Sequence, residues 1–251
     1  MKHIGVLAHS AEGAALCFLA ACHEGEERLG AHRHPDITLS IVPLAASMGH
    51  WERDELDEVR KILATTAERL AAAGADFFAC PDNTAHLALE RDGPDLPLPG
   101  LHIAEIAAET AAKHGYRCIG LLGTRWTMEG RSYADAFGRH ALEYRVPPQA
   151  ERQALNAIIF EELVRGQFKE PSRACVAGMI DGLKQAGCDA VALSCTEIPL
   201  LIDQPSSALP VIDSTRLLAQ AAVEVALGHR TLPVWRGGPL RSQVEQRFKG
   251  S

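Results

Sequence analysis

The chain has 251 residues, of which 47% are hydrophobic and 23% are charged, and these values are typical of a folded protein rather than a disordered one. A net charge of −7 argues against a nucleic-acid partner, because phosphate binding uses clustered Lys and Arg. No apolar run approaches the roughly 20 residues that span a bilayer, so we expect no membrane segment and a cytoplasmic location.

Short apolar runs alternate with longer segments of helical period along the whole chain. Because this alternation is typical of buried strands covered by helices, we predict an α/β fold with mainly parallel sheets. The predicted strands are residues 4–8, 38–42, 77–80, 118–122 and 191–193.

Glycines mark the ends of the predicted helices, because glycine adopts the left-handed conformation of a helix C-terminus at low cost. Gly74, Gly115, Gly166, Gly187 and Gly228 hold such positions. The predicted helices are residues 12–29, 53–73, 103–114, 132–137, 151–165, 172–186 and 215–227.

Two segments of the chain read as copies of each other. Residues 70–84 (LAAAGADFFACPDNT) align without a gap with residues 183–197 (LKQAGCDAVALSCTE), 113 positions further on. Residues 4–10 (IGVLAHS) resemble residues 119–125 (IGLLGTR), 115 positions further on. Since the two offsets nearly agree, we infer an internal duplication. The chain is therefore predicted to form two pseudo-symmetric Rossmann-like halves, each a mainly parallel sheet flanked by helices.

The boundary between the halves is expected in residues 91–100 (RDGPDLPLPG), whose three prolines indicate an irregular connection. Helix 215–227 lies at the far end of the chain and is expected to return to the first half. We therefore predict a first half of residues 1–98 and 211–230, a second half of residues 99–210, and a C-terminal tail of residues 231–251.

The cysteines do not form an evident disulfide or metal-binding pattern. There are seven, an odd number, and most stand among apolar residues, as reduced buried thiols do. Neither a CxxC nor an HExxH spacing occurs, so the sequence predicts no metal site.

Polar residues follow the predicted strands at the edge where ligands bind in open α/β sheets. The two copies of the repeat end in Asp82-Asn83-Thr84 and in Cys195-Thr196-Glu197. If the halves pack about a pseudo-twofold axis, Asp82 and Cys195 face each other across one cleft at the interface. That geometry suits chemistry on both faces of one carbon, so both residues are predicted to be catalytic.

Hydroxyl groups and backbone N–H groups at these strand ends suit a carboxylate, so we expect a small carboxylic or amino acid as the ligand. His86 stands about one turn into the helix after Asp82, where it could relay a proton or bind that carboxylate. The predicted substrate-binding residues at these positions are Ser10, Asn83, Thr84, His86, Thr124, Thr127, Thr196 and Glu197.

Residues 82–86 (DNTAH) and 195–199 (CTEIP) resemble the two signatures of the aspartate/glutamate racemase family, and further matches run through 122–129 and 158–168. The resemblance implies two Rossmann-like domains related by a pseudo-dyad, no PLP, no metal and a homodimer. It also implies that Lys169 lies near a loop able to hold the residue that recognises a side-chain carboxylate.

Family enzymes invert the α-carbon with two opposed bases, usually a pair of cysteines. Cys195 fills the second position, whereas Asp82 stands where the first cysteine normally lies, a place that some broad-specificity relatives fill with threonine. The loop that begins with His9-Ser10 also replaces the usual glycine-rich entry after the first strand. The resemblance thus implies a cofactor-independent amino acid racemase or epimerase, with aspartate and glutamate as the first substrates to test.

Three alternatives stay open. The ordinary pKa values of about 3.9 for Asp and 8.5 for Cys make the pair a carboxylate and a thiol at neutral pH, so Asp82 is either the second base or a group that binds the substrate ammonium. The enzyme could instead use Cys195 alone, as a decarboxylase or a cis-trans isomerase of a small dicarboxylic acid. The chain could also be a non-catalytic binding protein for small acids.

Overall fold

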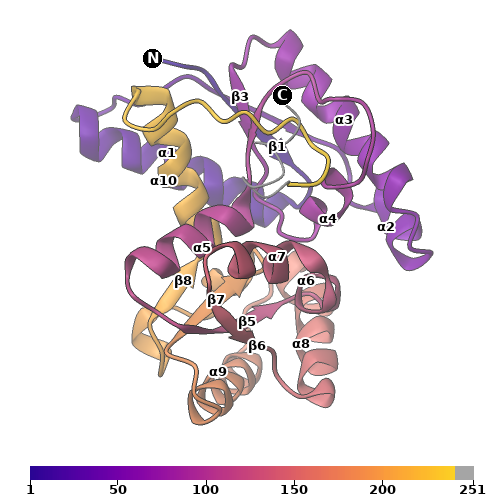
Figure 1. The fold of residues 1–251 in the computed structure, drawn as a ribbon, viewed down its shortest axis with the longest axis vertical. Helices are drawn as coiled ribbons and strands as arrows, with labels where there is room; N and C mark the ends of the chain where they lie inside the picture. Colours follow the sequence, from indigo (N-terminus) through magenta and orange to yellow (C-terminus); the bar gives the residue numbers. More distant parts are fainter. Residues whose placement is uncertain (241–251) are drawn as a thin grey trace, which may run out of the picture.

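The chain folds into two halves, each built around a four-stranded parallel sheet (Figure 1). The computed structural model describes residues 1–240. The sheets have the orders β2-β1-β3-β4 and β6-β5-β7-β8, so the predicted α/β class with two related halves is confirmed. The strands are β1 (Ile4–Ala8), β2 (Ile37–Ile41), β3 (Phe77–Ala79), β4 (Gly100–Leu101), β5 (Cys118–Gly123), β6 (Glu143–Arg145), β7 (Ala190–Ser194) and β8 (Val211–Asp213).

The register of the strands reproduces the predicted internal repeat. In the first sheet Ile4 of β1 pairs with Phe77 of β3, and in the second sheet Ile119 of β5 pairs with Ala190 of β7. These are the partners that the two sequence offsets require. The ends of β3 and β7, which bear Asp82 and Cys195 beyond them, are therefore equivalent places in the two halves.

Hydrogen bonds at the amino ends of the central strands β1 and β5 repeat in the same way. Asp76 accepts a 2.7 Å hydrogen bond from the backbone N–H of His3, just before β1. Asp189, 113 residues further on, accepts a 2.8 Å bond from the N–H of Arg117, just before β5. Equivalent aspartates thus hold the start of the central strand in both halves.

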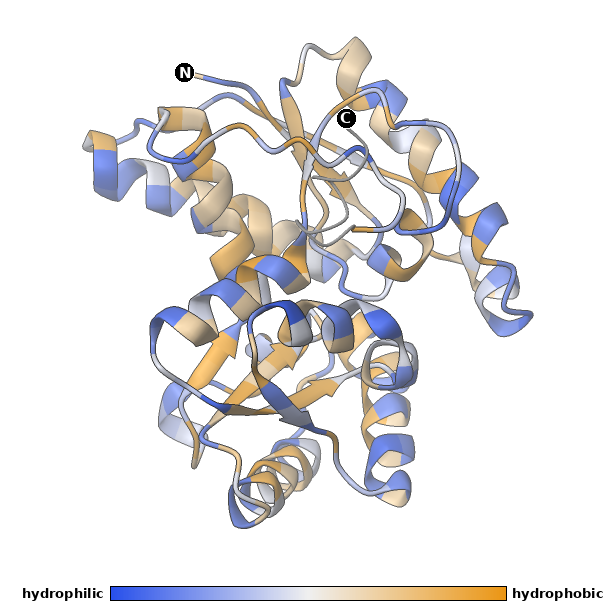
Figure 2. Cartoon of the chain, viewed as in Figure 1, coloured by the Kyte–Doolittle hydropathy of each residue, from blue (hydrophilic) through white to orange (hydrophobic). Residues whose placement is uncertain are grey.

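Helices cover both faces of the first sheet, whose central strands β1 and β3 are apolar while the outer helix faces are hydrophilic (Figure 2). Successive side chains of a strand point to opposite faces, so Phe77 packs with α1 and α10 while Phe78 packs with α3. The helices are α1 (Ala11–Leu29), α2 (Ala45–Glu52), α3 (Leu56–Ala72), α4 (Ala85–Leu89), α5 (Ile103–Lys113), α6 (Arg125–Glu129), α7 (Arg131–Arg139), α8 (Gln149–Glu161), α9 (Glu170–Gln185) and α10 (Ser214–Leu227), with 3-10 turns η1 (Leu163–Arg165), η2 (Ile198–Leu200) and η3 (Gln204–Ser206).

The predicted helix ends agree with the structure. All five glycines that were expected to stop helices have positive φ angles, from 67° at Gly166 to 93° at Gly187. Six short elements were not predicted, namely α2, α4, α6, β4, β6 and β8. The strands among them have two or three residues, and β6 is exposed and polar, so they leave no apolar run in the sequence.

The last part of the described chain connects the two halves. β8 pairs with β7 in the second sheet, and α10 then packs against α1 of the first half. Residues 231–240 of the predicted tail run along the first half, where the backbone N–H of Gly100 donates to Trp235 O at 2.7 Å. Residues 241–251 lie outside the described part, and the predicted boundaries of the halves stay a prediction.

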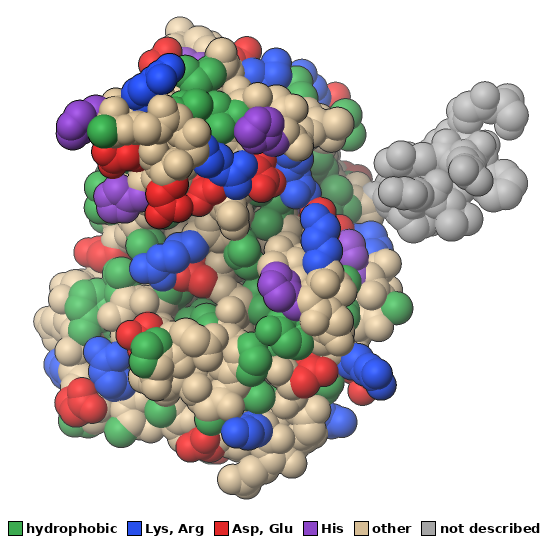
Figure 3. All heavy atoms as spheres, turned by 90° about the vertical axis from the view of Figure 1, so that its left-hand side faces the viewer, with side chains coloured by type: hydrophobic (Ala, Val, Ile, Leu, Met, Phe, Trp, Pro, Cys, Tyr) green, Lys and Arg blue, Asp and Glu red, His purple; other side chains and the backbone are tan. Residues whose placement is uncertain are grey.

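The surface of the described chain mixes charges of both signs. Figure 3 shows one face, on which Lys and Arg side chains alternate with Asp and Glu. Within residues 1–240 no helix combines the length and the apolar composition needed to cross a membrane.

Candidate active site

Asp82 and Cys195 line one pocket between the two halves. Asp82 follows β3 and Cys195 follows β7, so each side chain stands beyond the carboxyl end of a central strand. The pocket has a volume of ≈ 40 Å³. Its lining is His9, Ser10, Leu44, Met48, Trp51, Asp82, Asn83, Thr84, Thr124, Trp126, Ile159, Phe160, Val164, Cys195, Thr196 and Glu197.

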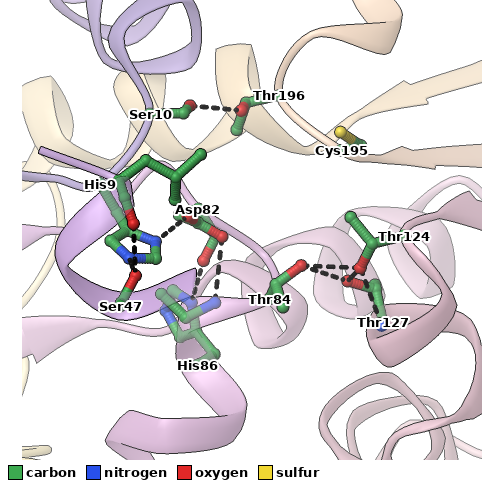
Figure 4. A network of polar contacts seen from close by, with 12 residues as sticks. His9, Ser10, Ser47, Asp82, Thr84, His86, Thr124, Thr127, Cys195 and Thr196 are labelled. Atoms are coloured by element: carbon green, nitrogen blue, oxygen red, sulfur yellow. Dashed lines mark hydrogen bonds and ion pairs between the residues drawn. The ribbon is translucent and has the colours of Figure 1, made fainter. Parts of the chain in front are cut away.

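The carboxylate of Asp82 is held by two donors (Figure 4). His9 Nδ1 lies 2.6 Å from Asp82 Oδ2, and the backbone N–H of Ala85 donates to Oδ1 at 3.0 Å. Burial opposes ionisation of Asp82, but the charge and hydrogen bond of His9 outweigh it and hold the pKa of Asp82 below its usual value. The side chain keeps 14% of its surface exposed, which leaves it free to meet a ligand.

His9 also contacts Ser47. Its Nε2 lies 2.7 Å from Ser47 Oγ, which in turn lies 3.0 Å from the carbonyl oxygen of Leu44. An ionised Asp82 can only accept a hydrogen bond, so His9 Nδ1 carries the proton of the 2.6 Å contact when Asp82 is a carboxylate. The imidazole of His9 is thus placed to exchange a proton with the carboxyl group of Asp82.

Cys195 is paired with the carboxylate of Glu197. Its Sγ donates to Glu197 Oε2 at 3.0 Å, and Thr196 Oγ1 donates to the same oxygen at 2.9 Å. Burial, followed by the charge of Glu197, raises the pKa of the Cys195 thiol well above its usual value. The charge of Asp82 adds to this effect, so the two groups lie within electrostatic reach of each other.

Three threonine hydroxyls lie close together at the interface between the halves. Thr84 Oγ1 lies 2.8 Å from Thr124 Oγ1 and 3.1 Å from Thr127 Oγ1. Thr124 also caps α6 by accepting from the N–H of Thr127 at 3.2 Å. Thr84 and Thr124 line the pocket, whereas Thr127 stands behind them.

Asn83 connects the site to the helices around it. Its amide donates to Ser214 Oγ at 3.2 Å and accepts from the hydroxyl of Tyr133 at 2.6 Å. Ser214 in turn donates to the carbonyl of Leu193 in β7. Asn83 therefore touches the pocket while its side chain ties β7, α7 and α10 to the first half.

Ser10 and Thr196 bring α1 close to the loop after β7. Their hydroxyl oxygens are 3.4 Å apart, and both residues line the pocket. A Cβ atom at Gly13, in the first turn of α1, would overlap the side chain of Thr196. The close approach of these two elements thus depends on glycine.

Besides Thr127, two predicted binding residues lie away from the pocket lining. His86 is buried, donates from Nδ1 to the carbonyl of Asp82 at 2.9 Å and accepts from the N–H of Ile103 at 3.3 Å. Lys169 has a side chain that is 52% exposed and lies 3.3 Å from Glu162 Oε1. His86 thus positions the backbone of Asp82, and Lys169 belongs to the surface.

No function was predicted from the sequence for His9 or Ser47. The sequence also did not predict that apolar residues such as Trp51 and Phe160, which come from helices, line the pocket. Within residues 1–240 no group of three His, Cys, Asp or Glu side chains is arranged to hold a metal ion.

The fold and the site together define a protein of two related α/β halves whose interface pocket holds a thiol and a carboxylate at equivalent strand ends. Residues 16–222 match the family model of the Asp/Glu/Hydantoin racemases. The chain belongs to that family, and so to a family of racemases.

Known proteins with similar sequence or structure agree with this assignment. The broad specificity amino-acid racemase RacX of Bacillus subtilis (strain 168) is 26% identical over 70% of this chain and 75% of its own length. The glutamate racemase of Pseudomonas entomophila (strain L48) is 28% identical over 79% of this chain and 75% of its own length. The crystal structure of an aspartate racemase homologue from Pyrococcus horikoshii OT3 superposes with a TM-score of 0.74 at 28% identity, over 90% of this chain and 100% of that one.

Proposed function

We propose that this protein is a racemase or epimerase of amino acids that works without a cofactor and exchanges the α-proton between Asp82 and Cys195. The observation that carries the proposal is that these two groups stand at equivalent strand ends and line one pocket. Inversion at Cα needs a proton-transfer group on each face of the carbon. Because the similar proteins are named racemases, this function is favoured over the decarboxylase, cis-trans isomerase and binding-protein alternatives.

Cys195 acts on one face as a thiolate. Glu197 Oε2 already accepts the thiol proton in a 3.0 Å hydrogen bond, so it takes that proton when the thiolate forms. The raised pKa of Cys195 makes the thiolate scarce but strongly basic, as abstraction of a weakly acidic α-proton requires. The α-proton then moves to Sγ and restores the thiol.

Asp82 and His9 act as one unit on the other face. The proton of His9 Nδ1 passes to Asp82, and Asp82 gives a proton to Cα, which leaves a carboxylate beside a neutral imidazole. In the reverse direction Asp82 takes the α-proton and one proton returns to His9, since imidazole is intrinsically the stronger base of the two. The pair therefore accepts a proton more readily than an isolated carboxylate. Glu197 and the pair exchange protons with water between turnovers.

The remaining polar groups suit the two charged ends of an amino acid. We assign the α-carboxylate to the hydroxyls of Thr84, Thr124 and Ser10, which donate hydrogen bonds in a site removed from water. We assign the ammonium group to Glu197, whose buried Oε1 has no hydrogen-bond partner among the described residues. The predicted homodimer stays a prediction, which light scattering of the purified protein checks.

The test is chiral chromatography of the nineteen chiral standard amino acids, each supplied as one enantiomer and incubated with the protein. We expect the opposite enantiomer to form from at least one of them, and Cys195→Ala to lower that rate by about 10³-fold or more. Binding of the same amino acid to Cys195→Ala should stay within about tenfold, since only the thiol is removed. Turnover that survives in the folded variant would contradict the proposal.

A further inference from the structure

The pocket has a polar part and an apolar part that come from different elements. The polar groups follow β1, β3, β5 and β7, whereas the apolar side chains belong to α2, α6, α8 and η1 and to the residue before α2. Figure 1 shows α2, α6 and α8 on the same side of the molecule, at the right of the view. The side chains that form this apolar wall are Leu44, Met48, Trp51, Trp126, Ile159, Phe160 and Val164.

Aromatic contacts join the wall into one surface across the two halves. The ring of Trp126 lies 5.8 Å from that of Trp51 and 5.8 Å from that of Phe160. Trp51 is nearly fully buried, and Phe160 is half-buried. Since the polar groups are assigned to the α-carboxylate, the ammonium and the α-proton, the wall is the surface left for the substrate side chain.

Within the described residues, no Lys or Arg lines the pocket. Its only basic group, His9, is already bonded to Asp82 and Ser47. Arg125 places its guanidinium 4.4 Å from the centre of the Trp126 ring, and it lines the neighbouring groove instead. The pocket itself already holds the carboxyl groups of Asp82 and Glu197. A substrate with a second carboxylate would therefore bury a negative charge beside two others without a cation to pair with.

We propose that the substrates of this site are amino acids with uncharged, apolar side chains, such as leucine, methionine or phenylalanine, rather than aspartate or glutamate. The inference rests on the proposed racemase function and names its substrate class. It departs from the acidic preference that the sequence resemblance implied, because no Lys or Arg among the described residues lines the pocket and Lys169 lies on the surface.

Leucine and aspartate are the sharpest pair of substrates, because both branch at Cγ and differ mainly in charge. We expect kcat/KM for racemisation of leucine to exceed that of aspartate by about 100-fold or more, the range that polar mismatches with a pocket produce. Methionine and phenylalanine should likewise exceed glutamate. A value for either acidic amino acid equal to or above those of all three apolar ones overturns the inference but leaves the racemase function standing.

The remaining outcomes separate the two proposals. Turnover of none of these five amino acids, with turnover of a polar or charged one, overturns the substrate class alone. Turnover of none of the nineteen chiral amino acids overturns the racemase function itself.

Phe160→Lys tests the wall directly by placing a cation in it. We expect this variant to lose about tenfold in kcat/KM for leucine and to gain about tenfold for aspartate, as one new charge pair does in a partly buried site. Phe168→Lys is the matched control, because Phe168 is 41% exposed and lies outside the pocket lining. An unchanged leucine-to-aspartate ratio in folded Phe160→Lys overturns the proposal. Val164→Lys, at a half-buried position of η1, replaces it if Phe160→Lys does not fold.

Discussion

His9 binds the carboxylate of Asp82 with one ring nitrogen and the hydroxyl of Ser47 with the other. Three residues that are far apart in the chain thus form one proton-holding unit. In the proposed mechanism, this arrangement lets an aspartate act where the sequence resemblance implies a cysteine. The carboxylate alone is a weak base, and the imidazole would hold the abstracted proton more firmly.

Replacement of His9 by Gln should shift the pH dependence of catalysis. Without the charge and hydrogen bond of His9, the effect of burial on Asp82 is opposed less strongly, so the pKa of Asp82 rises. We expect the acid limb of kcat/KM to move to higher pH and the rate at neutral pH to fall by about 10²-fold. Ser47→Ala keeps the contact between His9 and Asp82 and should move the limb much less. An acid limb that stays in place in His9→Gln would show that Asp82 works without the histidine.

Some of the site residues could be predicted from the sequence and others could not. Asp82 and Cys195 could be predicted because an internal repeat in the sequence places them at equivalent positions. The bond from His9 to Asp82 spans 73 residues, and only the pairing of β1 with β3 brings its two ends together. Lys169 was expected near the ligand by resemblance alone, and the structure pairs it with Glu162 on the surface.

At the level of secondary structure, the first turn of α1 sets the position of the loop after β7. Gly13→Ala introduces a methyl group where the Thr196 side chain lies, so the loop with Cys195 must shift. Because a small misplacement of a catalytic group costs up to about 10²-fold in rate, we expect a clear loss of activity with the fold retained. Gly178→Ala in α9 is the matched control, since nothing lies within 4 Å of the added carbon. Equal activity of the two variants would contradict the assigned position of Thr196.

His86 couples α4 to α5 and makes stability depend on pH. Its burial lowers its pKa to about 4, so the unfolded chain binds more protons than the native one between that value and about 6.5. The stabilisation of the native state by neutral His86 is fully present above pH ~6.5. It is lost as the pH falls towards 4, which lowers the free energy of unfolding by about 3 kcal/mol in total. In urea unfolding over this pH range, the free energy of unfolding should rise less steeply with pH for His86→Gln than for the natural chain. Equal dependence on pH in the two proteins would mean that His86 does not stay neutral in the native state.

Long elements were predicted within a few residues, since each leaves an apolar periodicity and a terminal glycine. The short elements were not, because α4 and α6 have five residues each and depend on tertiary contacts. The predicted tail shows the same limit. Trp235 packs against Phe78 and His86. The local sequence of residues 231–240 does not predict this contact.

In the whole molecule, the pocket is too small for an amino acid. Its volume of ≈ 40 Å³ holds about one water molecule. Trp51 from the first half and Trp126 from the second line both this pocket and an outer groove of ≈ 690 Å³. We therefore expect the pocket to widen when an amino acid binds, with these two side chains, and the elements that carry them, moving apart.

Binding of a substrate should change the fluorescence emission of Trp51 and Trp126, which line the pocket, because their surroundings rearrange. The third tryptophan, Trp235, lies on the other side of His86 and serves as the control. We expect the fluorescence change to persist in Trp235→Phe and to be lost in large part in Trp126→Phe. A change that disappears only with Trp235 would place the movement elsewhere.

The most direct test of the central claim, that two opposed groups exchange the α-proton, is racemisation of leucine in D2O followed by NMR at early times. Two proton-transfer groups on opposite faces place solvent deuterium in the product enantiomer while the remaining substrate keeps its proton. We expect this pattern in the natural chain, whereas Cys195→Ala should place no deuterium in the leucine enantiomer whose α-proton faces Cys195. Deuterium that accumulates in the substrate enantiomer without inversion would show a single working base and would contradict the account.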